Sequence, residues 1–307
     1  MTPFDSIIEA NRDYWTVRAA TYSKEVRDGE LCGVGYTPWL QAVEGRIAAH
    51  FAGRAAETIR VLDIATGPGF FAILAARAGH RVTAIDLTPS MLAEARANAG
   101  GLADHIDFRE MNAEALEFED ETFDVIVTRN LTWDLPHPEQ AYLEWHRVLK
   151  RGGLLLNFDA NWYRYLVDAE ARAAFDVDWD NAEAAGIPND NPDVDYGIME
   201  QIAAEVPLTR ELRPEWDIRV LTDIGFHAEA DTDVWKSVWN DEEHDAELSA
   251  TLREFLRNNC GYVATAQALH IHRSTLLYRL ERITELTGID LEDDQTRLLL
   301  QLTFLFG

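Results

Sequence analysis

The sequence predicts an α/β fold in which helices cover both faces of a parallel sheet, followed by a small all-α domain. Short apolar runs alternate with helix-like segments from residue 60 onward, and this alternation is typical of βαβ units. The first apolar run ends in a Gly-rich turn that opens a helix. Beyond residue 246 the apolar periodicity is helical only, so a second domain is expected there.

The composition fits a globular protein of one large or two modest domains. The chain has 307 residues, of which 47% are hydrophobic and 26% charged. Its 54 acidic and 27 basic residues give a net charge of −27, which argues against a surface coated with positive charge for nucleic acid or anionic lipid. Cys32 and Cys260 are too few for a disulfide framework. No basic region followed by an apolar stretch stands near Met1, so we expect a cytoplasmic protein.

The first strands are expected where apolar and β-branched residues form short runs. They fall at residues 60–65, 81–86, 105–109, 123–128 and 153–159. The helices expected between them fall at residues 70–78, 89–98 and 138–149. Pro89 and Ser90 open the second of these helices, with Ser90 as its expected cap. Such a succession implies a parallel sheet between two layers of helices.

The pattern changes after the fifth expected strand. Residues 161–213 are rich in Asp, Glu, Asn and Pro and predict an acidic insertion, with some helix, that covers one end of the sheet. A helix is expected at residues 214–224, followed by strands at 227–232 and 234–239. Because these two strands follow each other too closely for a crossover, they must be antiparallel. The sheet is therefore expected to have seven strands, with an antiparallel last strand.

The turn after the first strand has the composition of a ligand-binding loop. Ala65, Gly67 and Gly69 are small, so the backbone can approach a ligand where the helix start offers unpaired N–H groups. Asp63 lies in the first strand, and Asp86 ends the second, where a carboxylate can accept both hydroxyls of a ribose. These two acids beside the turn predict a nucleotide-like cofactor rather than a turn that needs Gly for its shape alone.

Two other nucleotide sites are less favoured. A dinucleotide loop has three Gly residues, but Phe70 or Ala72 stands where the third would lie. Nicotinamide and flavin binding therefore rank second. A kinase-like phosphate loop needs Gly-Lys-Ser or Gly-Lys-Thr, which this turn lacks.

The turn resembles the first motif of class I S-adenosylmethionine-dependent methyltransferases, an acid followed after two residues by small residues that alternate with Gly. The resemblance covers about residues 60–239 and departs from the motif at Ala65, where the family often has Gly. It implies a Rossmann-like sheet with an antiparallel last strand, and S-adenosylmethionine as the cofactor. The residues implied at the cofactor are Tyr22, Asp63, Ala65, Gly67, Gly69, Asp86, Leu87, Met91, Asn112, Ala113, Arg129 and Asn130.

The resemblance also implies what these residues contact. Gly67 and Gly69 would pass under the amino-acid part of the cofactor, with Asp63 near its ammonium group and Asp86 on its ribose. Along the adenine the family pattern places Leu87, Met91, Asn112 and Ala113, and at the transfer site Arg129 and Asn130. Tyr22, with Tyr14 and Trp15, lies in an expected N-terminal helix that covers the cofactor in the family. Core packing at helical spacing explains these aromatics equally well.

The implied reaction is in-line attack by a substrate nucleophile on the sulfonium methyl group, for which a general base is optional. Aromatic residues near the ends of the fourth and fifth strands are expected to wall a pocket, and they are Trp133, Trp162 and Tyr163. The candidate bases are Asp134, His137 and Asp159. Their alternative role is capping or turn formation, which is favoured for Asp134 and His137.

The predicted insertion contains a short run of alternating acidic residues. Asp176, Asp178 and Asp180 surround Trp179. Alternate acids on a surface segment are usually solvated, so no metal ion is expected here.

The C-terminal part predicts a helix-turn-helix. Helices are expected at residues 248–257, 262–269 and 273–286, with Leu276, Leu277, Leu280 and Ile283 facing the core. From residue 253 to 282 there are five Arg and two Glu, although the chain as a whole is acidic. The outward face of the third helix is expected to contact DNA through Arg273, Ser274, Thr275, Tyr278, Arg279 and Arg282.

The stretch 268–280 and the segment 288–293 closely resemble the C-terminal DNA-binding domain of the PucR family of bacterial regulators. The match runs to about residue 306 and departs from the family at Leu277, where Arg is frequent. It implies double-stranded DNA as a partner and a role in transcription regulation. A small helical domain kept only for dimerisation is the alternative.

Together these features predict a fusion protein. Residues 1–240 would form a methyltransferase domain acting on a small molecule, residues 241–247 a linker, and residues 248–307 the DNA-binding domain. A homodimer is expected, and no membrane partner. The alternatives are a regulator whose methyltransferase fold only senses a ligand, and a methyltransferase whose tail only dimerises.

Overall fold

The computed structural model describes residues 3–31, 36–184, 196–234, 242–258, 260–269, 271, 273–287 and 291. The chain divides into two compact units. The first comprises Met1–Arg172 and Asp193–Val238, and the second Ala173–Pro192 and Trp239–Gly307. No helix within the described residues is both long and apolar enough to cross a membrane.

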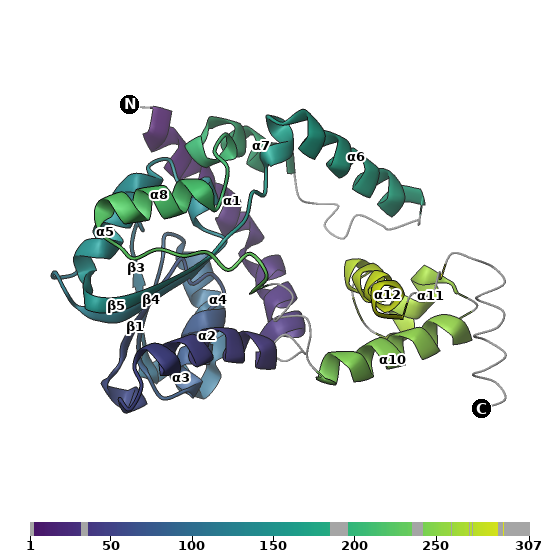
Figure 1. Ribbon diagram of the computed structural model, residues 1–307, viewed down its shortest axis with the longest axis horizontal. Helices are drawn as coiled ribbons and strands as arrows, with labels where there is room; N and C mark the ends of the chain where they lie inside the picture. The colour runs from purple at the N-terminus through teal and green to yellow at the C-terminus, as the bar shows by residue number, and fades with distance from the viewer. Residues whose placement is uncertain are drawn as a thin grey trace. The chain divides into compact units, whose positions relative to one another are not determined.

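A parallel sheet forms the centre of the first unit (Figure 1). Its strands are β1 (Arg60–Ile64), β2 (Arg81–Asp86), β3 (Ile106–Glu110), β4 (Phe123–Arg129) and β5 (Leu149–Phe158). They lie in the order β3-β2-β1-β4-β5, and each neighbouring pair is parallel. Asp63 on the central strand pairs in register with Ala84 on one side and Val127 on the other. The five strands predicted first are therefore confirmed.

The predicted seven-stranded sheet with an antiparallel last strand is wrong for the part of the chain that the structure describes. Residues 226–231 form no strand, and residues 235–239 of the last predicted strand lie outside the described residues. The alternation that suggested a strand at 227–232 places only the small residues Ala228 and Ala230 between polar ones. Such side chains bury too little apolar surface to hold a strand against a sheet.

Helices of the first unit cover the sheet. They are α1 (Pro3–Val26), α2 (Tyr36–His50), α3 (Phe70–Arg77), α4 (Pro89–Ala99), α5 (Pro138–Val148), α7 (Tyr196–Glu205) and α8 (Glu215–Ile224). Helix α6 (Ala169–Ala184) begins in this unit and continues past Arg172, where the unit ends. Shorter helical turns are η1 (Arg27–Leu31), η2 (Ala56–Thr58), η3 (Gly100–His105), η4 (Thr132–Asp134), η5 (Arg164–Leu166) and η6 (Pro207–Thr209). The expected helices at 70–78, 89–98, 138–149 and 214–224 are confirmed, and the cap of α4 is Thr88 rather than Ser90 because Pro89 is its first residue.

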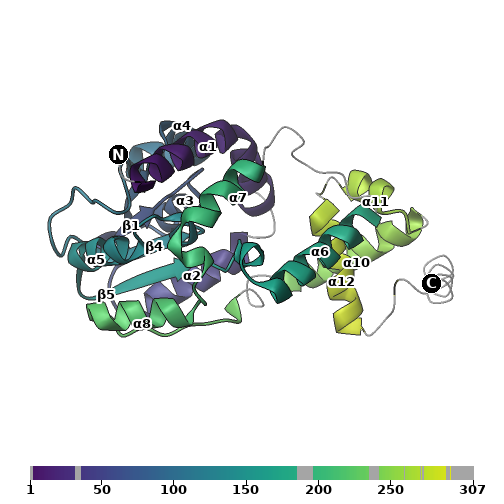
Figure 2. The ribbon, with the colours of Figure 1, turned by 90° about the horizontal axis from the view of Figure 1, so that it is seen from above.

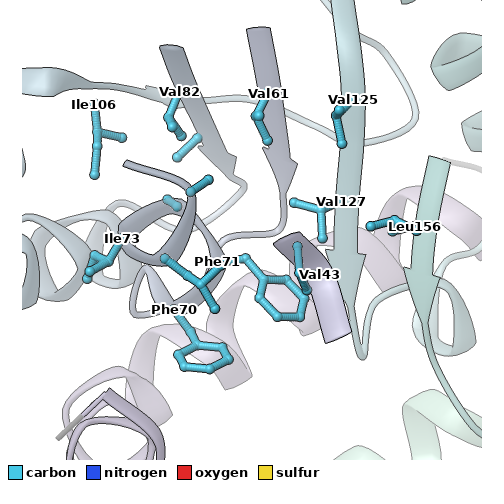
Figure 3. Close-up of a cluster of buried hydrophobic side chains, with 14 of the residues drawn as sticks. Val43, Val61, Phe70, Phe71, Ile73, Val82, Ile106, Val125, Val127 and Leu156 are labelled. Carbon is cyan, nitrogen blue, oxygen red and sulfur yellow. The ribbon is translucent and has the colours of Figure 1, made fainter. Parts of the chain in front are cut away.

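The alternation of side chains along β1 builds two hydrophobic layers. Val61 faces α2 and α3 and packs with Val43 and Phe71 (Figure 3). Leu62 points to the opposite face and joins a cluster with residues of α5 and α8, including Trp145 and Trp216. Both strand residues are fully buried. The two layers therefore fix the sheet, and with it the position of the strand ends.

A third cluster closes the carboxyl end of the sheet. Helix α1 packs along α4 and α7 (Figure 2). Ile7 of α1, Trp133 of η4, and Met199 and Val206 belong to one buried cluster there. The segment predicted as an insertion therefore supplies a helix that packs against the N-terminal helix.

The second unit contains α10 (Glu242–Arg257), α11 (Tyr262–Leu269) and α12 (Arg273–Thr287). Its core includes Leu248 and Phe255 of α10 and Leu276, Leu280 and Ile283 of α12. The three predicted helices are present, but α10 begins at Glu242, so residues 242–247 of the predicted linker are helical. Leu276, Leu280 and Ile283 are buried as predicted, whereas Leu277 is half-buried.

Candidate functional site

The Gly-rich turn between β1 and α3 adopts a backbone that small residues favour. Ala65, Gly67 and Gly69 have φ values of 54°, 52° and 91°. A side chain at Gly69 would place its Cβ 3.0 Å from Cβ and 3.2 Å from Cα of Ala95, so α3 can start this close to α4 only with Gly there. Gly67 instead faces the ring of Tyr22, whose Cε1 lies 3.8 Å from where its Cβ would be. Ala65 accepts a left-handed conformation without being Gly.

The side chain of Asp63 stabilises this turn through two hydrogen bonds. Its Oδ2 accepts hydrogen bonds from Thr66 Oγ1 at 2.6 Å and from the Ala72 amide at 2.8 Å. The side chain is buried, and burial raises the pKa of the Asp63 carboxyl to about 7 although both hydrogen bonds lower it. Asp63 thus ties the end of β1 to the first turn of α3.

Asp86 joins the turn to the end of β2. Its Oδ2 accepts a hydrogen bond from the Gly67 amide and its Oδ1 one from the Thr88 amide, both at 2.9 Å. Burial raises the pKa of Asp86, while these backbone hydrogen bonds lower it. An ionised carboxylate can accept about four hydrogen bonds, so each oxygen keeps capacity for a ligand. The structure thus brings into contact two of the residues that the sequence predicted at the ligand, Asp86 and Gly67.

Residues predicted along an adenine follow β2 and β3. Met91 of α4 is buried, and Leu87 offers its carbonyl to Arg12 Nε of α1 at 3.2 Å. Asn112 Oδ1 accepts the Glu114 amide at 2.9 Å, so this side chain stabilises its own turn. The carbonyl of Ala113 accepts the indole N–H of Trp145 at 3.0 Å.

Arg129, at the end of β4, points into a charged and aromatic cage. It forms two hydrogen bonds to the Glu30 carboxylate, at 2.8 and 2.7 Å, and one to the side chain of Tyr22. Its guanidinium carbon lies 4.9 Å from the ring centre of Phe70 and 5.2 Å from that of Trp39. Sequence reasoning missed Glu30, because 99 residues separate it from Arg129 and no local pattern connects them.

Asn130 and the predicted pocket aromatics lie beyond β4. Asn130 has φ 54°, and its carbonyl accepts the indole N–H of Trp133 at 3.0 Å. Trp133 is buried and stacks on Tyr163, with ring centres 4.9 Å apart. Trp162 is 51% exposed. The structure therefore brings Trp133 and Tyr163 together as packing partners and leaves Trp162 outside them.

The three candidate bases have different surroundings. Asp159 Oδ2 lies 2.8 Å from Arg213 Nη1 and accepts hydrogen bonds from Thr132 Oγ1 and the Trp133 amide. The side chain of His137 is 45% exposed, and its Nδ1 lies 3.3 Å from Glu114 Oε2.

Asp134 is buried beneath α1. Trp15 Nε1 donates to its Oδ2 at 3.4 Å, and Asn11 Nδ2 donates to its carbonyl at 3.0 Å. Burial raises the pKa of Asp134 well above its usual value; the Trp15 hydrogen bond lowers it, and the nearby carboxylates of Asp159 and Asp86 raise it further. Of the three candidates, Asp134 is the one that is buried and whose carboxylate accepts a hydrogen bond from a single side chain among the described residues, that of Trp15.

Arg213 is a second residue that sequence reasoning missed. Besides its ion pair with Asp159, it donates to Thr132 Oγ1 at 2.6 Å and to Asp217 Oδ2 at 2.7 Å. Tyr142 donates its hydroxyl to the same Asp217. Arg213 therefore ties the connection before α8 to the ends of β4 and β5.

Among the described residues no group of three or more His, Cys, Asp or Glu side chains is arranged to hold a metal ion. The side chains of Asp178 and Asp180 lie outside the described ones, and Asp176 is exposed on α6.

On α12, the predicted outward position of Arg279 is wrong. Its side chain is buried, and Nη1 donates to Thr251 Oγ1 of α10 at 3.3 Å. In a helix, residue 279 lies on the same face as the core residues Leu276 and Ile283, and this spacing was readable from the sequence. Thr275 and Tyr278 are half-buried. The side chains of Arg273, Ser274 and Arg282 lie outside the described ones.

Comparison with known proteins identifies both parts of the chain. Residues 62–157 match the methyltransferase domain family, and residues 248–306 match the PucR C-terminal helix-turn-helix domain. The chain is 43% identical over 102 residues to a ubiquinone/menaquinone biosynthesis C-methyltransferase of Bartonella tribocorum, covering 32% of this chain and 39% of that protein. It is 41% identical over 103 residues to an uncharacterized protein of Mycobacterium tuberculosis, covering 34% and 37%. The chain thus spans about two fifths of the length of these relatives.

A solved structure from Pyrococcus horikoshii is similar at 26% identity, with a TM-score of 0.37, over 44% of this chain and 63% of that one. The two family matches confirm both resemblances and S-adenosylmethionine as the cofactor. The chain joins an S-adenosylmethionine-dependent methyltransferase domain to a PucR-type helix-turn-helix domain.

Proposed function

We propose that the first unit transfers a methyl group from S-adenosylmethionine to a small molecule, and that the helix-turn-helix domain binds double-stranded DNA and regulates transcription. The main support for the methyltransferase proposal is the hydrogen bond from the Gly67 amide to the Asp86 carboxylate. It connects the turn after β1 to the end of β2. In open parallel sheets, ligands bind at the carboxyl ends of the strands.

The chemistry of the residues fits the cofactor. The Asp86 carboxylate keeps acceptor capacity for the two ribose hydroxyls, which are donors. Ala65, Gly67 and Gly69 leave room for its amino-acid part. The residues proposed along the adenine are Leu87, Met91, Asn112 and Ala113. Asp63 supports the turn through Oδ2, and we propose that its other oxygen faces the ammonium group.

Three further residues shape the amino-acid end of the site. Tyr22 lies against Gly67, and we propose that its ring shields this end from water. We propose that Arg129 helps to position the site and does not bind the cofactor directly, because its guanidinium group already forms two hydrogen bonds with the Glu30 carboxylate. The strained backbone of Asn130 directs the chain from β4 toward the transfer site.

When bound, S-adenosylmethionine supplies an electrophilic methyl group. We propose that Asp134 takes the proton that a hydroxyl acceptor loses, since it is buried and its raised pKa makes the ionised form the stronger base. Asp159 is less suited to this role because Arg213 and two donors hold it. We propose Trp162 and Tyr163 at the acceptor pocket, with Trp133 packing behind them.

Isothermal titration calorimetry with S-adenosylhomocysteine, the demethylated product, tests the cofactor site. We expect saturable binding by the full chain and at least ~10-fold weaker binding by Asp86→Asn, because the amide offers one acceptor oxygen in place of two. Asp107→Asn on the neighbouring β3 is the control, since Asp107 is exposed and pairs with Arg109. Equal affinity of Asp86→Asn and the unchanged chain would overturn this site.

Selection from random DNA duplexes tests the second unit. We propose DNA contacts by Arg273, Ser274, Thr275, Tyr278 and Arg282, which lie within the segment that matches the helix-turn-helix family. Arg279 is withdrawn from this set because its side chain is buried against α10. We expect one enriched sequence with the full chain and weaker enrichment with Arg273→Ala. Absence of enrichment would instead support a tail that only dimerises.

A further inference from the structure

A pocket of the first unit gathers arginine side chains in a chain whose net charge is −27. It has a volume of about 410 Å³ and lies where η5, η6 and the start of α8 meet. Arg164, Arg210 and Arg219 line it, together with Glu211 and Glu215. Three of its seven lining residues are arginines, whose planar guanidinium groups match the geometry of a phosphate or carboxylate.

Two of the three arginines keep their hydrogen-bond donors for a ligand. Arg210 and Arg219 are exposed, and within the described residues neither side chain forms an ion pair or a hydrogen bond. Arg164 is held in place, since Nη1 donates to the Arg210 carbonyl at 2.9 Å and Nη2 lies 3.1 Å from Asp168 Oδ2. Arg210 and Arg219 can therefore offer bidentate donors to a phosphate or carboxylate.

The pocket also has an apolar wall. Leu212 is 59% exposed, and Trp216 lines the pocket from a buried position. The Trp216 ring packs against Tyr142, with ring centres 6.0 Å apart. A large exposed Leu beside a fixed indole suits an apolar group attached to the anion.

The segment between Arg210 and Arg219 is held in place at Arg213. The Arg213 amide donates to Asn161 Oδ1 at 3.3 Å, and Asn161 Nδ2 donates to the Arg213 carbonyl at 3.1 Å. The Arg213 side chain is bound to Asp159 and Asp217. Binding would therefore order little additional chain, which lowers its entropic cost.

We propose that this pocket binds a small organic anion, with a phosphate or carboxylate held by Arg210 and Arg219 and an apolar group against Leu212 and Trp216. None of the lining residues belongs to the proposed cofactor site, so the proposal stands apart from methyl transfer.

Calorimetry of the full chain with phenyl phosphate at low ionic strength tests the proposal, with inorganic phosphate and phenol as separate arms. We expect saturable binding of phenyl phosphate, weaker binding of inorganic phosphate, and no heat from phenol. Saturating S-adenosylhomocysteine should leave the affinity unchanged, which separates this pocket from the cofactor site.

Arg210→Gln and Arg219→Gln should each weaken phenyl phosphate binding at least ~10-fold, because each removes a charge-assisted contact. Both side chains are exposed, so the variants should fold, and circular dichroism verifies this. Arg151→Gln is the matched control, since its side chain is 94% exposed and lies outside the pocket. No saturable heat, equal affinity for phenyl phosphate and inorganic phosphate, or unchanged affinity in both Arg variants would overturn the proposal.

Discussion

Replacing Arg213 with Met tests how the end of the sheet is held. The side chain is 6% exposed, and its partners Asp159 and Asp217 are 2% and 11% exposed. Removing one partner of a buried ion pair costs roughly 3–5 kcal/mol, because a charge remains buried without compensation. Asp159 would keep its hydrogen bonds from Thr132 and Trp133, and Asp217 that from Tyr142. We therefore expect a loss at the lower end of this range, so that the free energy of unfolding falls by about 3 kcal/mol.

Urea unfolding followed by tryptophan fluorescence measures this loss. Arg151→Met is the control, because its side chain is 94% exposed and surface changes cost less than about 0.5 kcal/mol. Adding Asp159→Asn to Arg213→Met removes one unpaired charge, so the double variant should lose at least ~1 kcal/mol less than the sum of the two single losses. A loss below about 1 kcal/mol for Arg213→Met, or strictly additive losses, would refute the role given to this residue.

Two further predictions concern the Gly-rich turn. Ala65→Gly should raise the free energy of unfolding by about 1 kcal/mol, since Ala65 has φ 54° and Gly adopts this region without steric cost; a lower melting temperature would contradict it. Burial raises the folded-state pKa of Asp63 to about 7 from 3.8, so the unfolded chain binds fewer protons there and stability should fall as pH rises from about 4 to 7. Asp63→Asn should remove this pH dependence, which is at most about 1.4 kcal/mol per pH unit. If the difference in free energy of unfolding between the two proteins stayed constant with pH, the raised pKa of Asp63 would be contradicted.

Local patterns predicted the parts of the fold that depend on near neighbours. Alternating apolar runs placed β1 to β5, and the small residues at Ala65, Gly67 and Gly69 placed the turn. The same alternation misled at residues 227–232, where only the small side chains of Ala228 and Ala230 were available for burial. Period alone does not distinguish a strand from an exposed connection when the apolar positions are that small.

The candidate site was predictable where one motif holds its residues together, as for Asp86 and Gly67. It was not predictable where partners come from distant segments. Arg213 reaches Thr132 across 81 residues, and no spacing rule connects them. Arg279 differs, because its place on the core face of α12 follows from helical spacing with Leu276. Arg279 was interpreted as a DNA contact because of its charge, but its side chain is buried against α10.

Transfer of labelled methyl groups tests the central claim most directly. The full chain would be incubated with S-adenosylmethionine carrying a radioactive methyl group and with a deproteinised extract of small molecules. The account predicts that label enters the small-molecule fraction with the unchanged chain and with Asp107→Asn, and not with Asp86→Asn. Binding of the cofactor without any transfer of label would contradict it, and would indicate a fold that senses its ligand.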